Sequence, residues 1–398
     1  MADELIKNKN AVLNSEQFSR NLFEKMKQVN PGIKDLEFYE FVYGLDNLIP
    51  DQGWNLISLE DIQSIETKIS QKEFFSSLKN KPVKNNKFVL DEQIIRLSQM
   101  LFKGLVTDYY SLNWLNSKFY FDIRSFIFFP RTQYFSQEVL THFGGMPFRS
   151  FDKKQEQFSS YLEIGYKDFG AANTEVDNAF INLVEKLIQV KDSPFLLTLA
   201  GPTAAGKTEI VSRLKDQLFQ KGFTVATIEM DNFNQDKDYR DTRANILETI
   251  HYEAFTQSLQ AILTGKKINI PRYDFYKGIS SHDFHGNIRP GSSCIEIDPA
   301  DIIFLEGNFP FHLPEIAHLI GVKIVYLTDD EIRLKRKWKR DIDLRKKYDP
   351  INFVNRYFRT QFIRAEEIYL PLMKICDMLV DTTAANIWVK TELRESLG

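Results

Sequence analysis

The chain has little cysteine and no long apolar run, and these two absences narrow the classes of protein it can belong to. Only Cys294 and Cys376 occur in 398 residues, and their spacing suits neither a metal site nor a redox motif. We therefore expect no disulfide framework. No apolar stretch approaches the ~20 residues that a membrane-spanning helix needs. The first ten residues lack the apolar core of a secretory signal, so we expect a cytoplasmic protein, with export without a cleaved signal as the alternative.

A strong excess of one charge is also lacking. The chain has 51 Lys and Arg against 54 Asp and Glu, a formal net charge of -3. Such a balance gives no general attraction to nucleic acid or to an anionic membrane, and we expect neither as a partner. The length allows two domains, each with its own core. We expect an N-terminal domain of unknown role at 1–150, a polar linker at 151–172 and a second domain at 173–398.

The most informative segment is 201–208, which fits the P-loop pattern G-x-x-x-x-G-K-[ST]. A short apolar run at 195–200 suits a buried strand, and apolar residues at helical spacing follow the loop. This context predicts that backbone N–H groups wrap the phosphates of ATP, that Lys207 reaches the β- and γ-phosphates, and that Thr208 ligates Mg²⁺. The predicted nucleotide-binding residues are Gly201, Pro202, Thr203, Ala204, Ala205, Gly206, Lys207 and Thr208.

Strand-like and helical segments alternate after the P-loop. Strands are predicted at 224–229, 301–305, 322–327 and 378–380, and helices at 207–221, 248–264, 329–347 and 351–370. This alternation predicts an α/β fold, a P-loop kinase domain with a parallel sheet covered by helices on both faces. Helices at 15–29 and 91–104 and a strand-like segment at 118–130 predict a separate, mainly helical or α+β N-terminal domain, without a catalytic constellation.

Acidic residues stand at the ends of two predicted strands. Asp231 follows the second strand and Glu306 ends the third. Ligands of parallel sheets bind at the carboxyl ends of the strands. Asp231 there could accept the proton of an attacking hydroxyl, and Glu306 could hold or orient Mg²⁺. An Asp that only caps a turn remains the alternative for Asp231.

A basic segment spans 333–347 and contains nine Lys or Arg. Arg333, Arg336 or Lys337, and Arg340 recur at helical spacing on one face. Such side chains could close over a phosphate as a lid and exclude water. The alternatives are a solvated helix face and an RNA-binding patch, although the segment is short and only Trp338 interleaves it.

In this order the motifs resemble the uridine kinase and phosphoribulokinase family. Besides the P-loop, the chain has Asp-Asn-Phe-Asn from Asp231, Pro-Arg-Tyr-Asp-Phe at 271–275, an apolar run into Glu-Gly at 299–307 and a basic segment ending Arg-Asp-Ile at 333–342. The resemblance covers about 192–390. It implies a kinase that uses ATP and Mg²⁺ to phosphorylate a small-molecule hydroxyl, first of all the 5′-hydroxyl of uridine or cytidine.

The resemblance also implies roles for single residues. Asp231 would be the base, and Tyr273 and Phe275 would flank the nucleobase. The catalytic set is Asp231, Lys207, Arg336 and Arg340, and the metal set is Thr208, Glu306 and Asp231. The substrate-binding set is Tyr273, Asp274, Phe275, Lys337, Asn245 and Arg356.

The acceptor side departs from the family pattern. Gly278 stands in place of a typical histidine, Asn245 stands near a typical acid, and Arg356 stands in place of a glutamine. The acceptor could therefore be another small alcohol, such as a sugar phosphate, a pantothenate-like molecule or nicotinamide riboside. A nucleotide-dependent switch whose residues 1–150 bind a protein partner or a second copy is a further alternative. A tRNA prenyltransferase shares the P-loop sequence but not the later motifs.

Overall fold

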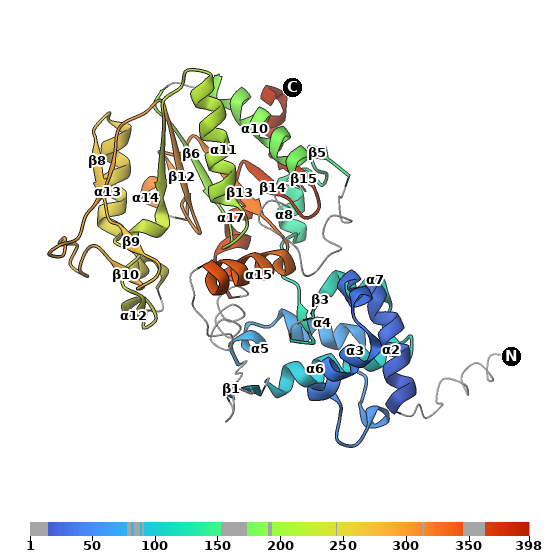
Figure 1. The fold of residues 1–398 in the computed structure, drawn as a ribbon. Coiled ribbons are helices and arrows are strands. Elements are labelled where there is room, and N and C mark those ends of the chain that lie inside the picture. Colours follow the sequence, from blue (N-terminus) through green and yellow to red (C-terminus); the bar gives the residue numbers. More distant parts are fainter. Residues whose placement is uncertain are drawn as a thin grey trace. The chain divides into compact units, whose positions relative to one another are not determined.

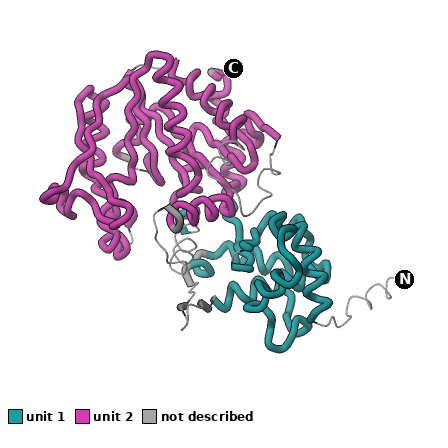
Figure 2. The backbone as a smooth tube through the Cα atoms, in the orientation of Figure 1, with its two compact units in different colours: residues 1–133, 154–169, 347–364 teal, residues 134–153, 170–346, 365–398 magenta. Residues whose placement is uncertain are grey.

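The computed structural model describes residues 15–77, 81–82, 88–89, 91–123, 125–152, 173–189, 193–243, 245–312, 314–344 and 363–397. They fall into two compact units (Figure 2). The first contains the described residues up to Gln133 together with 363–364, and the second contains the rest. Each unit is considered by itself below.

The first unit consists of helices and a hairpin around an aromatic core. Its helices are α2 (Ser15–Val29), η2 (Pro31–Asp35), α3 (Phe38–Leu45), η3 (Asp46–Leu48), η4 (Trp54–Leu56), α4 (Ile62–Ser70), α5 (Lys72–Ser77), α6 (Glu92–Val106) and α7 (Leu112–Lys118), and its strands are β1 (Lys81–Pro82), β2 (Phe88–Val89), β3 (Phe119–Asp122) and β4 (Ile127–Pro130). Phe18 of α2 stacks on Trp54 with ring centroids 4.2 Å apart, and all residues of β3 and β4 are buried. The prediction of a separate, mainly helical unit is confirmed.

The second unit is built on a seven-stranded sheet with the order β5-β15-β14-β13-β6-β12-β7. The strands are β5 (Arg149–Ser150), β6 (Phe195–Ala200), β7 (Val225–Glu229), β12 (Ile302–Gly307), β13 (Val322–Leu327), β14 (Met378–Asp381) and β15 (Asn386–Val389). Parallel pairing joins β7, β12, β6, β13 and β14, and this confirms the predicted parallel sheet. At the other edge β15 pairs antiparallel with β14 and with β5, a pairing that the sequence pattern does not indicate.

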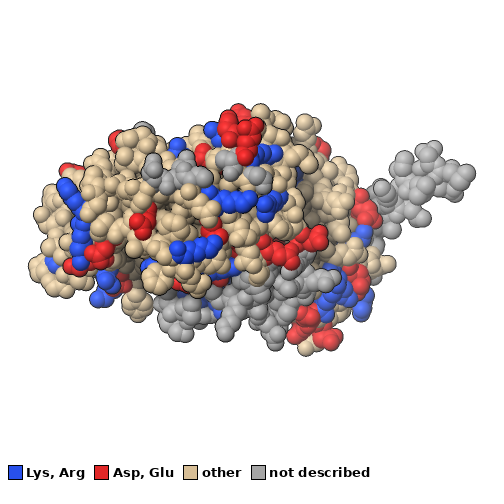
Figure 3. All heavy atoms as spheres, turned by 90° about the horizontal axis from the view of Figure 1, so that it is seen from above, with Lys and Arg blue, Asp and Glu red and all other residues tan. Residues whose placement is uncertain are grey.

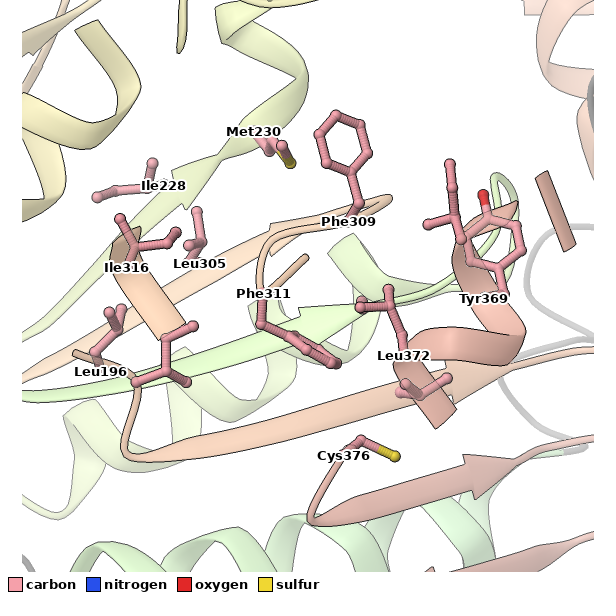
Figure 4. Packing of buried hydrophobic residues seen from close by; sticks show 14 of the residues in the cluster. Leu196, Ile228, Met230, Leu305, Phe309, Phe311, Ile316, Tyr369, Leu372 and Cys376 are labelled. Carbon is pink, nitrogen blue, oxygen red and sulfur yellow. The ribbon is translucent and has the colours of Figure 1, made fainter. Parts of the chain in front are cut away.

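Helices cover both faces of this sheet (Figure 1). Side chains alternate along a strand, so Leu196 of β6 packs in one core and Leu197 in the other. The helices α10 (Thr174–Gln189), α11 (Lys207–Gln220) and α18 (Thr391–Leu397) line the core of Leu197. The helices α8 (Gln137–His142), α13 (Tyr252–Leu263), α14 (Pro314–Ala317) and α17 (Leu370–Met373) line the core of Leu196, part of which Figure 4 shows. The predicted covering of both faces is confirmed.

The segments that follow the carboxyl ends of the strands are shorter and less regular. They comprise η6 (Met230–Phe233), α12 (Lys237–Arg240), η7 (Ile246–Thr249), the strands β8 (Ile268–Ile270), β9 (Tyr273–Asp274), β10 (Ile279–Ser280) and β11 (Ile295–Ile297), then α15 (Asp330–Trp338), η8 (Lys339–Leu344) and η9 (Ala365–Tyr369). β8 pairs with β11 and β9 with β10, both antiparallel. The helix predicted at 329–347 continues beyond Trp338 as a π-helix, and 351–362 of the helix predicted at 351–370 lie outside the described residues.

Charge is well mixed over the face of the molecule seen in Figure 3, where Lys and Arg lie among Asp and Glu. This agrees with the small net charge of -3. Within the part of the chain that the structure describes, no helix combines the length and apolar character needed to cross a bilayer.

His251, directly before α13, is a buried polar residue that links three segments. Its Nδ1 lies 3.1 Å from Nε2 of Gln235, and its Nε2 lies 3.1 Å from Oγ of Ser280. Burial, with a smaller contribution from the nearby His282, lowers the pKa of His251 to about 4. The ring is therefore neutral in the folded protein at pH 7.

The unfolding free energy should depend on the protonation of His251. The unfolded chain binds this proton with a pKa of 6.5, and the folded chain binds it with a pKa of about 4. The contribution of neutral His251 to the unfolding free energy is therefore fully present above pH 6.5 and is lost as the pH falls toward 4. We expect His251→Gln to remove up to about 3 kcal/mol of this pH dependence of the unfolding free energy, because glutamine does not titrate and one pKa unit corresponds to about 1.4 kcal/mol. Urea unfolding at several pH values measures it. Equal slopes in both proteins would contradict the assignment; His285→Gln, an exposed histidine, is the control.

Candidate active site

The P-loop joins β6 to α11 and depends on two glycines. Gly201 has a φ of +155°, and a Cβ on it would lie 2.2 Å from the backbone oxygen of Tyr326 in β13. Gly206 precedes α11 with a φ of +106°, in the left-handed region that favours glycine. The loop is thus pressed against the neighbouring strand, and the first turn of α11 presents its free N–H groups to the loop.

Three cationic side chains are hydrogen-bonded to oxygens of this loop. Lys207 Nζ donates to the carbonyls of Gly201 at 2.9 Å and Pro202 at 3.1 Å. Arg336 Nη1 donates to the carbonyl of Ala205 at 3.2 Å, and Arg340 Nη2 donates to Oγ1 of Thr203 at 3.1 Å. All these acceptors are neutral oxygens. The contacts bring three of the four residues of the predicted catalytic set together at the loop, namely Lys207, Arg336 and Arg340.

Arg333 does not share the position of Arg336 and Arg340. It is completely buried, and its Nε donates to the carbonyl of Thr328 at 3.0 Å. Its Nη2 donates to the hydroxyl of Tyr134 at 3.1 Å and to the carboxylate of Asp330. Arg333 therefore fixes the start of α15, so that the next turns of the basic segment reach the P-loop.

Glu306, at the end of β12, faces the first turn of α11. Its Oε1 accepts a hydrogen bond of 2.7 Å from the hydroxyl of Thr208, while its buried Oε2 has no hydrogen-bond partner. The pKa of Glu306 is raised to about 7, chiefly by burial; Glu229 and Asp231 also raise it, whereas Lys207 and the hydrogen bond from Thr208 lower it.

This pair of residues suits Mg²⁺. A hydroxyl and a carboxylate are oxygen ligands, which Mg²⁺ prefers, and it usually takes its remaining ligands from water and phosphates. The unpartnered oxygen of Glu306 is the buried atom that a cation would satisfy. Among the described residues there is no cluster of three or more His, Cys, Asp or Glu that could hold a metal by itself.

Asp231 lies in η6, two residues beyond the end of the second strand predicted from the sequence. It is half-buried, and its carboxylate accepts no hydrogen bond from the described residues. Its charge raises the pKa values of Lys207, Glu229 and Glu306, although burial is the largest influence on each. Asp231, Lys207 and Glu306 therefore share one electrostatic environment at the carboxyl ends of the strands.

The aromatic pair predicted for the acceptor lies on the hairpin β9–β10 and beyond it. Tyr273 is buried, and its ring meets that of Phe275 edge-on with centroids 5.1 Å apart. The backbone N–H of Tyr273 donates to Oδ1 of Asn232 at 3.3 Å, which ties the hairpin to the segment after β7. Tyr273 thus lies beside the residues that follow Asp231.

The other predicted acceptor residues make local contacts. Asp274 is exposed and accepts from the backbone N–H groups of Tyr276 and Lys277 at 2.9 and 3.0 Å, as in a turn. Asn245 is exposed and caps η7, and Lys337 pairs with Asp341 one turn further along. Arg356 lies outside the described residues.

Arg240 of α12 contacts the predicted acceptor residue Tyr273, and the sequence analysis does not single it out. Its Nη2 donates to the hydroxyl of Tyr273 at 2.6 Å, and its Nη1 donates to Oδ1 of Asn234 at 3.2 Å. It stands in an irregular segment without periodicity, between Asp231 and the next long helix. Only a motif for this segment could have identified it.

Part of the second unit is similar in sequence to known kinases. The sequence model of the phosphoribulokinase / uridine kinase family matches residues 196–382. Uridine kinase-like protein 3 of Arabidopsis thaliana is 26% identical over 225 residues, which are 53% of this chain and 45% of that protein. Uridine-cytidine kinase 2-B of Danio rerio is 28% identical over 207 residues, 49% of this chain and 75% of the relative.

These relatives share only part of their length with this chain. The chain spans less than half of the Arabidopsis protein and 37% of uridine-cytidine kinase A of Dictyostelium discoideum. Among solved structures, a possible uridine kinase of Bacillus stearothermophilus is 18% identical with a TM-score of 0.32, covering 44% of this chain and 94% of that one. A D-glycerate 3-kinase of Cryptococcus neoformans is 13% identical with a TM-score of 0.38, covering 53% and 97%.

The family match coincides with the parts of the second unit that carry the site. It begins in β6, directly before the P-loop, and runs past β14, so it includes Asp231, Glu306 and the basic segment of α15. The resemblance inferred from the order of the motifs is thereby confirmed. Residues 196–382, just under half of this chain, match the sequence model of the phosphoribulokinase / uridine kinase family.

Proposed function

We propose that this kinase transfers the γ-phosphoryl group of ATP to a hydroxyl group of a small molecule. The observation that carries the proposal is the meeting of Lys207, Asp231 and Glu306 at the carboxyl ends of neighbouring parallel strands, where ligands of such sheets bind. A phosphate site, a candidate base and a candidate metal ligand are thus combined in one place.

The cations around the P-loop are suited to hold the phosphates. Lys207, Arg336 and Arg340 donate to neutral oxygens of the loop, and Arg340 donates in addition to the carboxylate of Asp341. Phosphate oxygens would add the attraction between opposite charges to such hydrogen bonds. Phosphates bound in the loop would therefore draw these donors away from its backbone and side-chain oxygens. Mg²⁺, held by Thr208 and Glu306, would neutralise phosphate charge when bound.

Asp231 is the candidate base for the transfer. The hydroxyl oxygen of the acceptor would form a bond to the γ-phosphorus, the bond between this phosphorus and ADP would break, and the hydroxyl proton would pass to the carboxylate of Asp231. Arg336 and Arg340 would stabilise the charge on the transferred group and keep water from attacking in place of the acceptor.

Uridine and cytidine are the first candidate acceptors. Relatives named as uridine or uridine-cytidine kinases support them, and Tyr273 and Phe275 offer aromatic surfaces to a base. Gly278, near the hydroxyl of Tyr273, supports a different small alcohol instead, because the histidine typical of this position is missing. Incubation of the full chain with Mg-ATP and a panel of nucleosides and small alcohols, read by mass, tests the proposal. ATP binding without any phosphorylated product would favour a nucleotide-dependent switch.

Replacing Lys207 should abolish transfer. Lys207→Ala removes the donor expected at the β- and γ-phosphates, and the loss of one such preorganised donor costs on the order of 10²–10³-fold or more in turnover. Lys215→Ala, an exposed lysine of the same helix α11, is the matched control and should keep full activity. A fully active Lys207→Ala protein would rule out the P-loop as the phosphate site.

Asp231→Asn should separate binding from turnover. The amide keeps the size of the side chain but cannot accept a proton, so we expect ATP affinity within about twofold and turnover reduced by roughly 10²–10⁴-fold. Equilibrium binding of ATP and initial rates measure the two effects. Asp238→Asn, on an exposed position of α12, is the control. Unchanged turnover would remove Asp231 from the role of base.

Glu306→Gln should affect the dependence on Mg²⁺. The variant retains an oxygen and a similar volume but lacks the negative charge beside Thr208, so the concentration of Mg²⁺ for half-maximal rate should rise by about tenfold or more. Its thermal unfolding should stay close to that of the wild type. Glu296→Gln, an exposed acid of β11, serves as the control. The same Mg²⁺ requirement in all three proteins would contradict a metal role for Glu306.

A further inference from the structure

Arg240 places a guanidinium group beside the hydroxyl of Tyr273. Besides its hydrogen bond of 2.6 Å to this hydroxyl, its guanidinium carbon lies 5.0 Å from the centre of the Tyr273 ring. The Nε atom of Arg240 is buried and has no hydrogen-bond partner. The side chain is therefore held against the aromatic residue proposed for acceptor binding, with one N–H donor unused.

The protein supplies Arg240 with no acidic partner among its described residues. Its two acceptors are the amide oxygen of Asn234 and the hydroxyl of Tyr273, both neutral. The neighbouring cations differ: Arg289 pairs with Asp236 at 2.6 Å, and Arg243 lies 3.8 Å from Glu248. Arg289 and Arg243 each have a nearby carboxylate. Arg240, which is partly buried, has no such carboxylate among the described residues.

Asn234 connects Arg240 to the candidate base. The Nδ2 of Asn234 donates to the backbone oxygen of Asp231 at 2.7 Å, and its Oδ1 accepts from Arg240. One residue thus bridges the segment that bears the base and the guanidinium group. A small molecule whose hydroxyl lies at Asp231 could therefore place its other end near Arg240.

We propose that the acceptor carries a carboxylate or a phosphate, and that Arg240 binds this anionic group. The inference rests on the phosphotransfer proposed above and specifies its substrate class. A buried charge without a counter-charge is costly, and an anion on the substrate would compensate it. The planar guanidinium matches the two oxygens of a carboxylate or phosphate, and its free Nε donor fits such a contact. A neutral nucleoside would leave the charge of Arg240 uncompensated.

The experiment compares matched acceptors that differ in one anionic group. Pantothenate against pantothenol tests a carboxylate, ribulose 5-phosphate against ribulose tests a phosphate, and uridine represents neutral nucleosides. Initial rates with Mg-ATP are measured for the wild type, Arg240→Gln and the control Arg243→Gln, whose arginine is exposed and stacks on Tyr239. Thermal unfolding of each protein verifies that it is folded.

We expect an anionic acceptor to be preferred over its neutral analogue. Arg240→Gln should raise the KM for that acceptor by about 10- to 100-fold, the size expected for hydrogen bonds to a charged group, and leave the KM for ATP unchanged. Arg243→Gln should behave as the wild type. A preference for uridine or another neutral acceptor, or an equal preference in Arg240→Gln, would overturn the inference while leaving the phosphotransfer intact.

If no acceptor of the panel is phosphorylated, the phosphotransfer proposal fails and anion binding is tested directly. With Mg-ADP saturating the P-loop, inorganic phosphate or acetate should raise the unfolding temperature of the wild type and of Arg243→Gln but not of Arg240→Gln. The anion that does so identifies the source of the charge. The same rise in Arg240→Gln, or no rise in the wild type, would overturn the inference.

Discussion

The contact between the cationic side chains and the oxygens of the P-loop is the interaction on which the site depends. Lys207 comes from the loop itself, whereas Arg336 and Arg340 come from a segment more than a hundred residues further along the chain. Their acceptors in the loop are neutral oxygens, although Arg340 also donates to the carboxylate of Asp341 at 3.3 Å, and a triphosphate would offer charged acceptors at the same place. Because β13 pairs with β6 in the sheet, the segment that follows β13, with α15, carries these distant cations to the P-loop.

The two sides of the site differ in how they handle charge. On the phosphate side, acids and cations lie close together, and burial with neighbouring acids raises the pKa of Glu306 to about 7. On the proposed acceptor side, the hydrogen-bond acceptors of Arg240 among the described residues are neutral oxygens of Asn234 and Tyr273. The first arrangement suits a metal-bound nucleotide, which brings its own charges of both signs. The second suits a molecule that brings a negative charge.

Most strands of the second unit could be predicted from the sequence, because the local apolar patterns agree with the way the strands pack in the folded protein. The run at 195–200 forms β6 as predicted, and the strands predicted around 224–229, 301–305 and 322–327 are β7, β12 and β13 within one or two residues. The strands β6, β12 and β13 contribute buried apolar side chains to the cores on both faces, as a sheet covered on both sides requires. The P-loop, Asp231 and Glu306 could be placed because each is tied to the end of such a strand.

The remaining features depend on contacts that no local pattern encodes. The short polar strand Arg149–Ser150 falls at the end of the N-terminal domain predicted at 1–150, yet it pairs with β15 and belongs to the sheet of the second unit. Arg333 has the spacing of a lid residue, but the carbonyl of Thr328 and the hydroxyl of Tyr134 hold it inside the fold. Arg240 lies in an irregular segment, and only the folded hairpin reveals its contact with Tyr273.

The central claim is that the cations at the P-loop are phosphate ligands. A crystal structure of the full chain with Mg²⁺ and a non-hydrolysable ATP analogue tests it most directly. The account predicts that Lys207 and Arg336 leave the carbonyls of Gly201 and Ala205 and donate to phosphate oxygens, with Mg²⁺ beside Thr208 and Glu306. A nucleotide bound elsewhere, or phosphates in the loop while both side chains keep their present carbonyl partners, would contradict it.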